Sequence, residues 1–348
     1  MGGDHDACRC YPIVMRAGPA GVISPERRMP RGTLPGTLVA MRTVVIFLAL
    51  AFGLSWLVAL PLWFGDGLAS PFFGLIAVAM MATPAIAALV VVFFVERPAR
   101  RAHALGLWPL GRPGRFLRYL ALAIVVPVAL ILVALPIGAL LGVYPADFVG
   151  FSGFQALTDA QLEATGAPAL PFPIGVLVAL QFVNVLIGAF LNLIPAMGEE
   201  LGWRGWLLPK LLPLGVLPAI LLSGVIWGLW HAPLVLLGYN YPLAPGWLGV
   251  VMMCGMCILI GAVFSWLRLR SGSVWAPALA HGAFNAAAGF SIVFVAAGEV
   301  IDTTQATILG WSGWIVPLVL VVVLALTGRF SPREVAPAQE PEDAAPRA

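Results

Sequence analysis

Residues 173–208, PIGVLVALQFVNVLIGAFLNLIPAMGEELGWRGWLL, join a long apolar run to two adjacent carboxylates, Glu199 and Glu200. The apolar part is long enough to cross the hydrocarbon core of a bilayer, for which about 20 residues are needed. A charged side chain at the centre of a membrane costs about 3 kcal/mol by insertion scales, so it persists where it pairs, binds a metal or lines a water-filled cavity. The stretch therefore predicts a membrane helix that carries chemistry.

The composition of the whole chain agrees with this interpretation. Of its 348 residues, 61% are hydrophobic and 10% are charged, and the mean hydropathy is +0.97. A soluble protein of this length needs more charge to cover its surface, so we predict an all-α, polytopic integral membrane protein. The apolar runs are continuous rather than alternating, which excludes a transmembrane β-barrel. The arginines flank apolar segments without forming a basic, aromatic-rich face, so we expect a lipid bilayer and no nucleic acid as partner.

The predicted domain organisation is a membrane domain between two disordered ends. The leader, 1–41, and the tail, 331–348, are rich in Gly, Pro, Ala and charged residues and lack apolar runs. The membrane domain, 42–330, contains eight apolar segments of spanning length. They lie near 43–65, 70–95, 120–143, 173–197, 214–237, 247–267, 274–298 and 308–328.

Charge alternates between the connections of these segments. One set carries the basic residues Arg27, Arg28, Arg31, Arg42, Arg97, Arg100, Arg101, Arg112, Arg115, Arg118, Arg204, Lys210, Arg268, Arg270, Arg329 and Arg333. The other set carries Asp66, Asp147, Asp159, Glu163, Glu299 and Asp302, without any lysine or arginine. Because basic connections stay in the cytoplasm, we predict eight spans with both termini cytoplasmic. The Ala, Gly, Pro and Arg content is typical of a GC-rich bacterial gene, so the expected location is a bacterial plasma membrane.

Three polar motifs interrupt the apolar segments. In the first, Glu200 and Arg204 are four residues apart and share a helix face, whereas Glu199 points about 100° away and stays free for chemistry. The second is WGLWHAP, with Trp227 four residues before His231. The third is HGAFN, which puts His281 and Asn285 on one helix face. Each motif alone also suits a structural ion pair or an interhelical hydrogen bond.

Together, these side chains are the parts of a hydrolytic site. A carboxylate and an imidazole activate water, and an imidazole and an amide stabilise an oxyanion. One carboxylate with two imidazoles is also a catalytic zinc ligand set. The pair Cys254 and Cys257 is read instead as core packing, because no second cysteine pair accompanies it.

The ordered patterns EExxxR, aromatic-xxxH and HxxxN resemble those of the CPBP family of intramembrane proteases. That family contains type II CAAX prenyl endopeptidases and bacteriocin-processing or immunity-type relatives such as lysostaphin-resistance proteins. The resemblance covers about 175–295. One departure is Trp227, where the family usually has phenylalanine, and we expect it to alter packing rather than chemistry.

The resemblance implies hydrolysis of a peptide bond in a membrane-associated or lipid-anchored peptide. By position, Glu199 would be the general base, aided by His231, while His281 and Asn285 would stabilise the oxyanion. Glu200 and Arg204 would support them. The family is described both as glutamate-dependent and as metal-dependent; in the second version Glu199, His231 and His281 would hold a divalent metal such as zinc.

Other functions fit the sequence less well but stay open. A serine mechanism would have to use Ser223 with His281, and no apolar segment offers the two aspartates of a presenilin-like protease. A proton-coupled transporter or a non-catalytic, immunity-type scaffold would also place ionisable groups inside the membrane.

If every helix were straight, the three motifs would lie at different depths in the membrane. His231 would lie about 20 Å beyond Pro218, which is near the start of its segment, at 1.5 Å per residue. Pro195, Pro213 and Pro233 permit broken helices that would let them meet. We therefore expect a water-filled cavity that opens to the cytoplasm.

Overall fold

The computed structural model describes residues 34–331, with side chains from residue 41 onward. Within this range every regular element is helical, apart from one isolated bridge between Ala146 and Val295. Five helical stretches are long and apolar enough to cross a membrane: Met41–Trp63, Phe73–Glu96, Pro113–Leu140, Ile174–Leu191 and Gly246–Ser271. Two shorter apolar helices, Val216–Trp230 and Trp311–Leu326, accompany them. The predicted all-α, polytopic membrane class is confirmed, while eight spans and cytoplasmic termini stay predictions.

The elements follow one another with short connections, and their bounds are as follows. They are α1 (Leu34–Trp63), η1 (Gly67–Ala69), α2 (Phe73–Met81), α3 (Thr83–Val90), η2 (Val91–Glu96), α4 (Arg101–Ala104), α5 (Pro113–Leu140), α6 (Ser152–Thr165), α7 (Ile174–Leu191), α8 (Leu193–Glu200), η3 (Leu201–Leu207), α9 (Leu208–Leu211), η4 (Leu212–Leu214), α10 (Val216–Trp230), α11 (Ala232–Val235), α12 (Gly246–Ser271), α13 (Trp275–Ala287), α14 (Phe290–Val293), η5 (Trp311–Trp314) and α15 (Ile315–Leu326).

Two of these elements begin earlier than the sequence suggested. The first helix, α1, starts at Leu34, inside the stretch predicted as a disordered leader; the rest of the leader and the tail after 331 lie outside the described residues. The third span was expected near 120, yet α5 starts at Pro113. Proline suits the first turn of a helix, and arginine side chains in that turn extend to the membrane surface.

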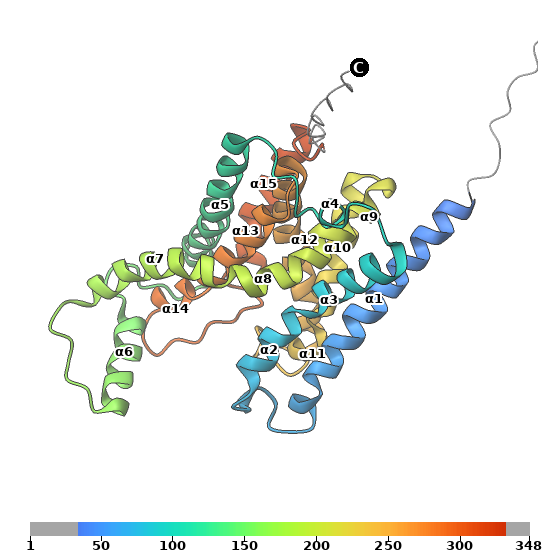
Figure 1. Ribbon diagram of the computed structural model, residues 1–348. Coiled ribbons are helices and arrows are strands. Elements are labelled where there is room, and N and C mark those ends of the chain that lie inside the picture. Colours follow the sequence, from blue (N-terminus) through green and yellow to red (C-terminus); the bar gives the residue numbers. More distant parts are fainter. Residues whose placement is uncertain (1–33, 332–348) are drawn as a thin grey trace, which may run out of the picture.

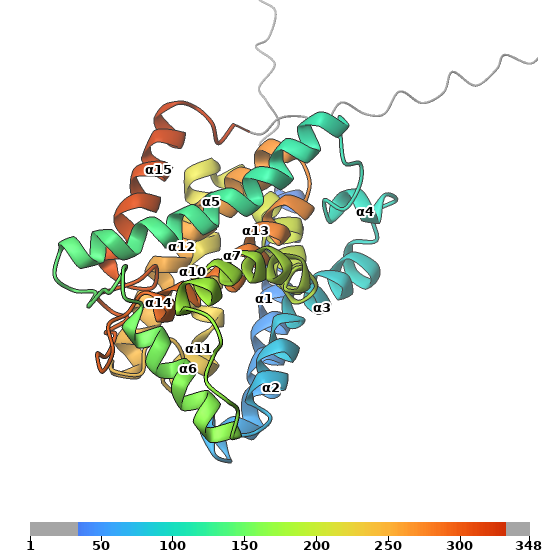
Figure 2. The ribbon, with the colours of Figure 1, turned by 90° about the vertical axis from the view of Figure 1, so that its left-hand side faces the viewer.

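The helices near the centre of the bundle pack through small residues. Figure 1 shows α10 and α12 in the middle of the molecule, with α1 along one edge. Gly224 and Gly228 of α10 meet the backbone of α12 at Ile258 and Cys254, with no room for a Cβ. Gly282 of α13 meets α7 at the carbonyl of Ala189 in the same way. Such close approach fixes the relative positions of helices that carry His231 and His281. In Figure 2, α6 stands apart from the bundle at the front.

The segments that bear the motifs are broken rather than straight. The predicted span 173–197 is interrupted at Asn192, whose side chain donates to the carbonyl of Gly188 at 2.9 Å. After α8, residues Leu201–Leu207 form a π-helix, a geometry that is frequent at functional sites. The next motif helix, α10, ends before His231, because Pro233 lacks the N–H that would continue the ladder.

Candidate active site

Glu199 and Glu200 end α8, and both are enclosed by protein. Their exposed fractions are 2% and 0%. Two adjacent carboxylates at this depth each need a partner, because an isolated buried charge is strongly disfavoured. The structure supplies different partners to the two side chains.

Glu200 belongs to a buried chain of charged groups with Arg204 and His281. Its Oε1 accepts from Arg204 Nη1 at 2.8 Å and lies 3.0 Å from His281 Nδ1. The Arg204 guanidinium also lies 4.4 Å from the Trp227 ring centroid and 5.4 Å from that of Phe264, both cation–π distances. Because a carboxylate is only an acceptor, His281 Nδ1 must donate, and its Nε2 is the nitrogen left for other contacts.

Glu199 pairs with a tryptophan instead of an arginine. The Trp227 indole N–H donates to Glu199 Oε2 at 2.7 Å. From the sequence, Trp227 was expected to change packing alone, but a phenylalanine at this position would leave this carboxylate oxygen without its donor. The hydrogen bond from Trp227 goes to Oε2, and among the described residues no side chain or backbone group is bonded to Glu199 Oε1, so that oxygen is free.

His231 sits at the C-terminal end of α10, held by the same tryptophan. Its Nδ1 is 2.8 Å from the carbonyl oxygen of Trp227. A carbonyl only accepts, so Nδ1 carries the proton and Nε2 of the neutral ring is an acceptor. The rings of Trp227 and Trp230 flank the imidazole, at centroid distances of 5.7 and 4.8 Å.

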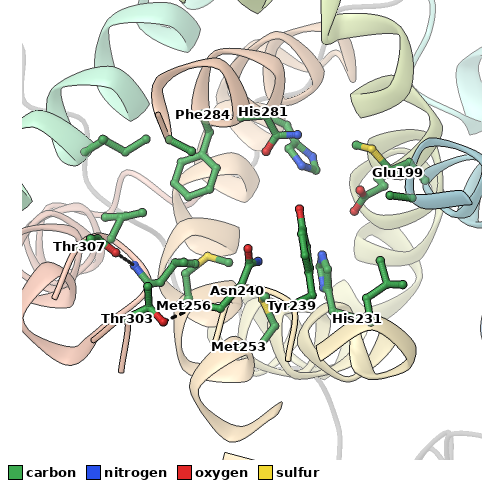
Figure 3. A pocket seen from close by; sticks show the side chains of 18 of the residues that line it. Glu199, His231, Tyr239, Asn240, Met253, Met256, His281, Phe284, Thr303 and Thr307 are labelled. Atoms are coloured by element: carbon green, nitrogen blue, oxygen red, sulfur yellow. Dashed lines mark hydrogen bonds between the residues drawn. The ribbon is translucent and has the colours of Figure 1, made fainter. Parts of the chain in front are cut away.

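One cavity of about 390 Å³ joins the three motifs. Glu199, Trp227, His231, His281 and Asn285 all line it. Asn285 lies one turn after His281 on α13 and is exposed. In Figure 3, Glu199 and His281 lie along one side of the cavity, and His231 faces them from the other side. The broken helices thus bring all four predicted catalytic residues, Glu199, His231, His281 and Asn285, to one space.

The cavity contains polar residues that sequence reasoning missed. Tyr239 and Asn240 come from the connection after α11, and Thr303 and Thr307 from the connection before η5. In Figure 3 the Tyr239 hydroxyl points between Glu199 and His281. The signal that could have indicated them is the polar Tyr-Asn-Tyr group, 239–241, shortly after the motif that contains His231.

Within the described part of the chain, the cavity residues do not form a metal-binding cluster. Among residues 34–331 no group of three or more His, Cys, Asp or Glu side chains is placed to hold one ion. The side chains as they stand do not fit a three-ligand metal centre, so no step below is routed through a metal.

Comparison with known proteins identifies the region around this cavity. Residues 181–287 match the family model described as type II CAAX prenyl endopeptidase Rce1-like. They form an Rce1-like domain. A 96-residue part of the chain, 26% of its length, is 33% identical to CAAX prenyl protease 2 of Methanococcus maripaludis and covers 34% of that protein. The chain thus matches about a third of the length of this curated relative.

The Rce1-like domain contains all three motifs, from Glu199 to Asn285. The resemblance to the CPBP proteases is therefore confirmed for this region. It lies within the predicted protease core, 175–295, whose exact bounds stay a prediction. The apolar helices around the Rce1-like domain make the protein an integral membrane protein.

Proposed function

We propose that this protein is an intramembrane endopeptidase that hydrolyses a peptide bond in a membrane-associated or lipid-anchored peptide. The observation that carries the proposal is one cavity lined by a carboxylate, two imidazoles and an amide from three separate helices. The Rce1-like domain supports the same class of activity. We place the protein in a bacterial plasma membrane.

Glu199 is the proposed general base. Its Oε2 is held by Trp227, and its free Oε1 takes a proton from a water molecule in the cavity. The hydroxide adds to the carbonyl carbon of the substrate and forms a tetrahedral oxyanion. His231 Nε2, an acceptor, orients the attacking water. When the C–N bond breaks, the proton on Glu199 passes to the leaving amine.

His281 and Asn285 are the proposed donors to the oxyanion. Because His281 Nδ1 donates to Glu200, its Nε2 donates as well only in the imidazolium form. Glu200 Oε1 lies 3.0 Å from His281 Nδ1 and holds the ring in place. Arg204 balances Glu200 from the other side, so Glu200 and Arg204 act by positioning. Preorganised donors of this kind contribute more in a dry site than in water.

The test is cleavage of a quenched, lipid-anchored peptide by the full chain in detergent. Glu199→Gln keeps the shape of the side chain but removes the base, so we expect turnover to fall by about 10²–10⁴-fold. Glu163→Gln, on the exposed face of α6, is the matched control and should leave turnover unchanged. Full turnover of the Glu199→Gln protein would defeat the assignment.

The same assay tests whether a metal ion is needed and whether the protein is an enzyme. Turnover measured before and after treatment with a metal chelator reports whether an ion is needed. An immunity-type scaffold would bind the peptide without cutting it, and a transporter would instead move protons in proteoliposomes.

The curated relative is named for prenylated CAAX substrates; for this chain we propose only the broader class of anchored peptides.

A further inference from the structure

The connections of the described chain fall into two groups. The acidic face comprises connections 64–72, 141–173, 236–245 and 294–314, which hold no lysine or arginine. The arginine face comprises connections 97–112, 212–215 and 272–274 with the helix ends beside them, where the basic residues lie.

Hydrogen bonds and ion pairs link connections within each face. On the acidic face, the Ala296 N–H donates to the carbonyl of Pro145 at 2.8 Å, and Thr303 donates to that of Asn240 at 2.6 Å. On the arginine face, Lys210 pairs with Glu96 at 2.7 Å. The two groups are therefore opposite ends of one bundle, as the charge alternation predicts.

The cavity lies in the half of the bundle next to the acidic face. On α12, Met256 is ten residues from the acidic-face end and fifteen from the arginine-face end, roughly 15 and 22 Å at 1.5 Å per residue. On α5, Leu135 is roughly 8 Å from the acidic-face end and roughly 33 Å from the other. Met80, on α2, is likewise roughly 10 Å from the acidic-face end of its span.

Large buried side chains lie on one side of the cavity, and polar connection residues line the other. Toward the arginine face stand Arg204, Trp227 and Phe264, with exposed fractions of 0%, 2% and 0%. His281, only six residues into α13, lies against this layer, stacked on Phe264 at 5.5 Å. Toward the acidic face the lining consists of connection residues, including Asn240 and Thr303.

We propose that the substrate enters this cavity from the acidic face. Because basic connections stay in the cytoplasm, the acidic face is extracytoplasmic. The substrate class is then a membrane-anchored peptide whose cleaved segment lies on the extracytoplasmic side, as in an exported peptide. The apolar side chains of Met80, Met253 and Met256 provide a wall for the anchored flank of such a peptide. The inference rests on the proposed protease function and reverses the cytoplasmic opening expected from the sequence.

The experiment uses sealed membrane vesicles of the two orientations that contain the full chain. The probe is a quenched peptide with one lipid anchor and a highly charged segment that cannot cross the bilayer. We expect cleavage in right-side-out vesicles to exceed that in inside-out vesicles at least tenfold, with detergent removing the difference. Equal cleavage in the two sealed preparations, or faster cleavage in inside-out vesicles, would overturn the inference.

Cysteine labelling separates this inference from the protease function. In a chain whose native cysteines are replaced by alanine, Thr303→Cys reports on the cavity, Glu299→Cys on the acidic face and Arg112→Cys on the arginine face. A membrane-impermeant maleimide added to right-side-out vesicles should label Thr303→Cys and Glu299→Cys but not Arg112→Cys. Labelling of Thr303→Cys only in inside-out vesicles would overturn the inference. Absence of cleavage in detergent, by contrast, would refute the protease function and leave the labelling result to decide the direction of access.

Discussion

The two ends of the bundle are built differently. Near the arginine face the interior is filled by large side chains such as Trp203, Trp206 and Arg204, all at most 1% exposed. Near the acidic face the helices enclose a cavity. The connections there are held by side chains such as Asp147, whose carboxylate accepts hydrogen bonds from three backbone amides. The packed half therefore fixes the polar groups, and the open half leaves space for a substrate beside them.

The largest expected effect comes from removing a charge in the packed half. Arg204→Met would leave Glu200 buried beside a lone histidine, which should cost about 3–5 kcal/mol of stability. Thermal unfolding in detergent would measure the loss. The double variant Arg204→Met/Glu200→Gln should recover part of the stability, because the uncompensated charge is gone. A single variant as stable as the parent would show that the packed half does not depend on this pair.

The second effect is at the boundary between the halves. Trp227→Phe keeps the ring and removes the donor to Glu199, a hydrogen bond to a charged group worth about 1.5–3 kcal/mol. We expect kcat to fall by roughly 10–100-fold if the bond positions the base, with KM little changed. Trp230→Phe is the control, since its N–H donates to Thr83 and not to Glu199. Equal losses in both variants would mean that the effect is packing alone.

A smaller effect is expected in the open half, and it depends on pH. Hydrogen bonds from the Ser152 side chain and from the backbone of Gly150 and Ser152 lower the pKa of Asp147 to about 2, from an ordinary value of 3.8. A lowered pKa stabilises the fold above the ordinary value, and this contribution disappears as the pH falls from about 4 to about 2.

Asp147→Ala should therefore reduce the melting temperature slightly at neutral pH and make no difference near pH 2. A series of melting curves across that pH range measures it. A gap between variant and parent that stays constant with pH would contradict the assignment.

The smallest effect is expected on the lipid-facing surface. Leu180 on α7 is 51% exposed and lies outside the cavity lining. Leu180→Ala should change stability by no more than about 0.5 kcal/mol and leave turnover unchanged. Thermal unfolding and the peptide assay check both; a clear loss of either would indicate that this surface contacts something besides lipid.

The sequence predicted the outer helices better than the site. Long apolar runs such as that of α5 follow directly from hydropathy, because a bilayer imposes a minimum length. The face shared by Glu200 and Arg204 follows from helix periodicity. Each of these features depends on local sequence alone.

The convergence of the three motifs on one cavity could not be predicted in the same way. It depends on the breaks at Asn192 and before Pro233, and proline alone does not say which way a chain turns. Tyr239 enters the site from a connection, and the depth of the cavity depends on how several helices pack. These are tertiary properties: the Tyr-Asn-Tyr group marks a polar connection, but no single segment shows that this connection reaches the cavity.

Trp227 contributes its indole to Glu199 and its carbonyl to His231. The carboxylate and the imidazole are thus tethered to a single amino acid, although they come from different helices. Glu199 is also fixed through α8, where Gly198 packs against the backbone of Met81 with no room for a Cβ. Residue 227 therefore sets the spacing between the proposed base and the imidazole, and a change of side chain there alters the surroundings of Glu199 and His231 together.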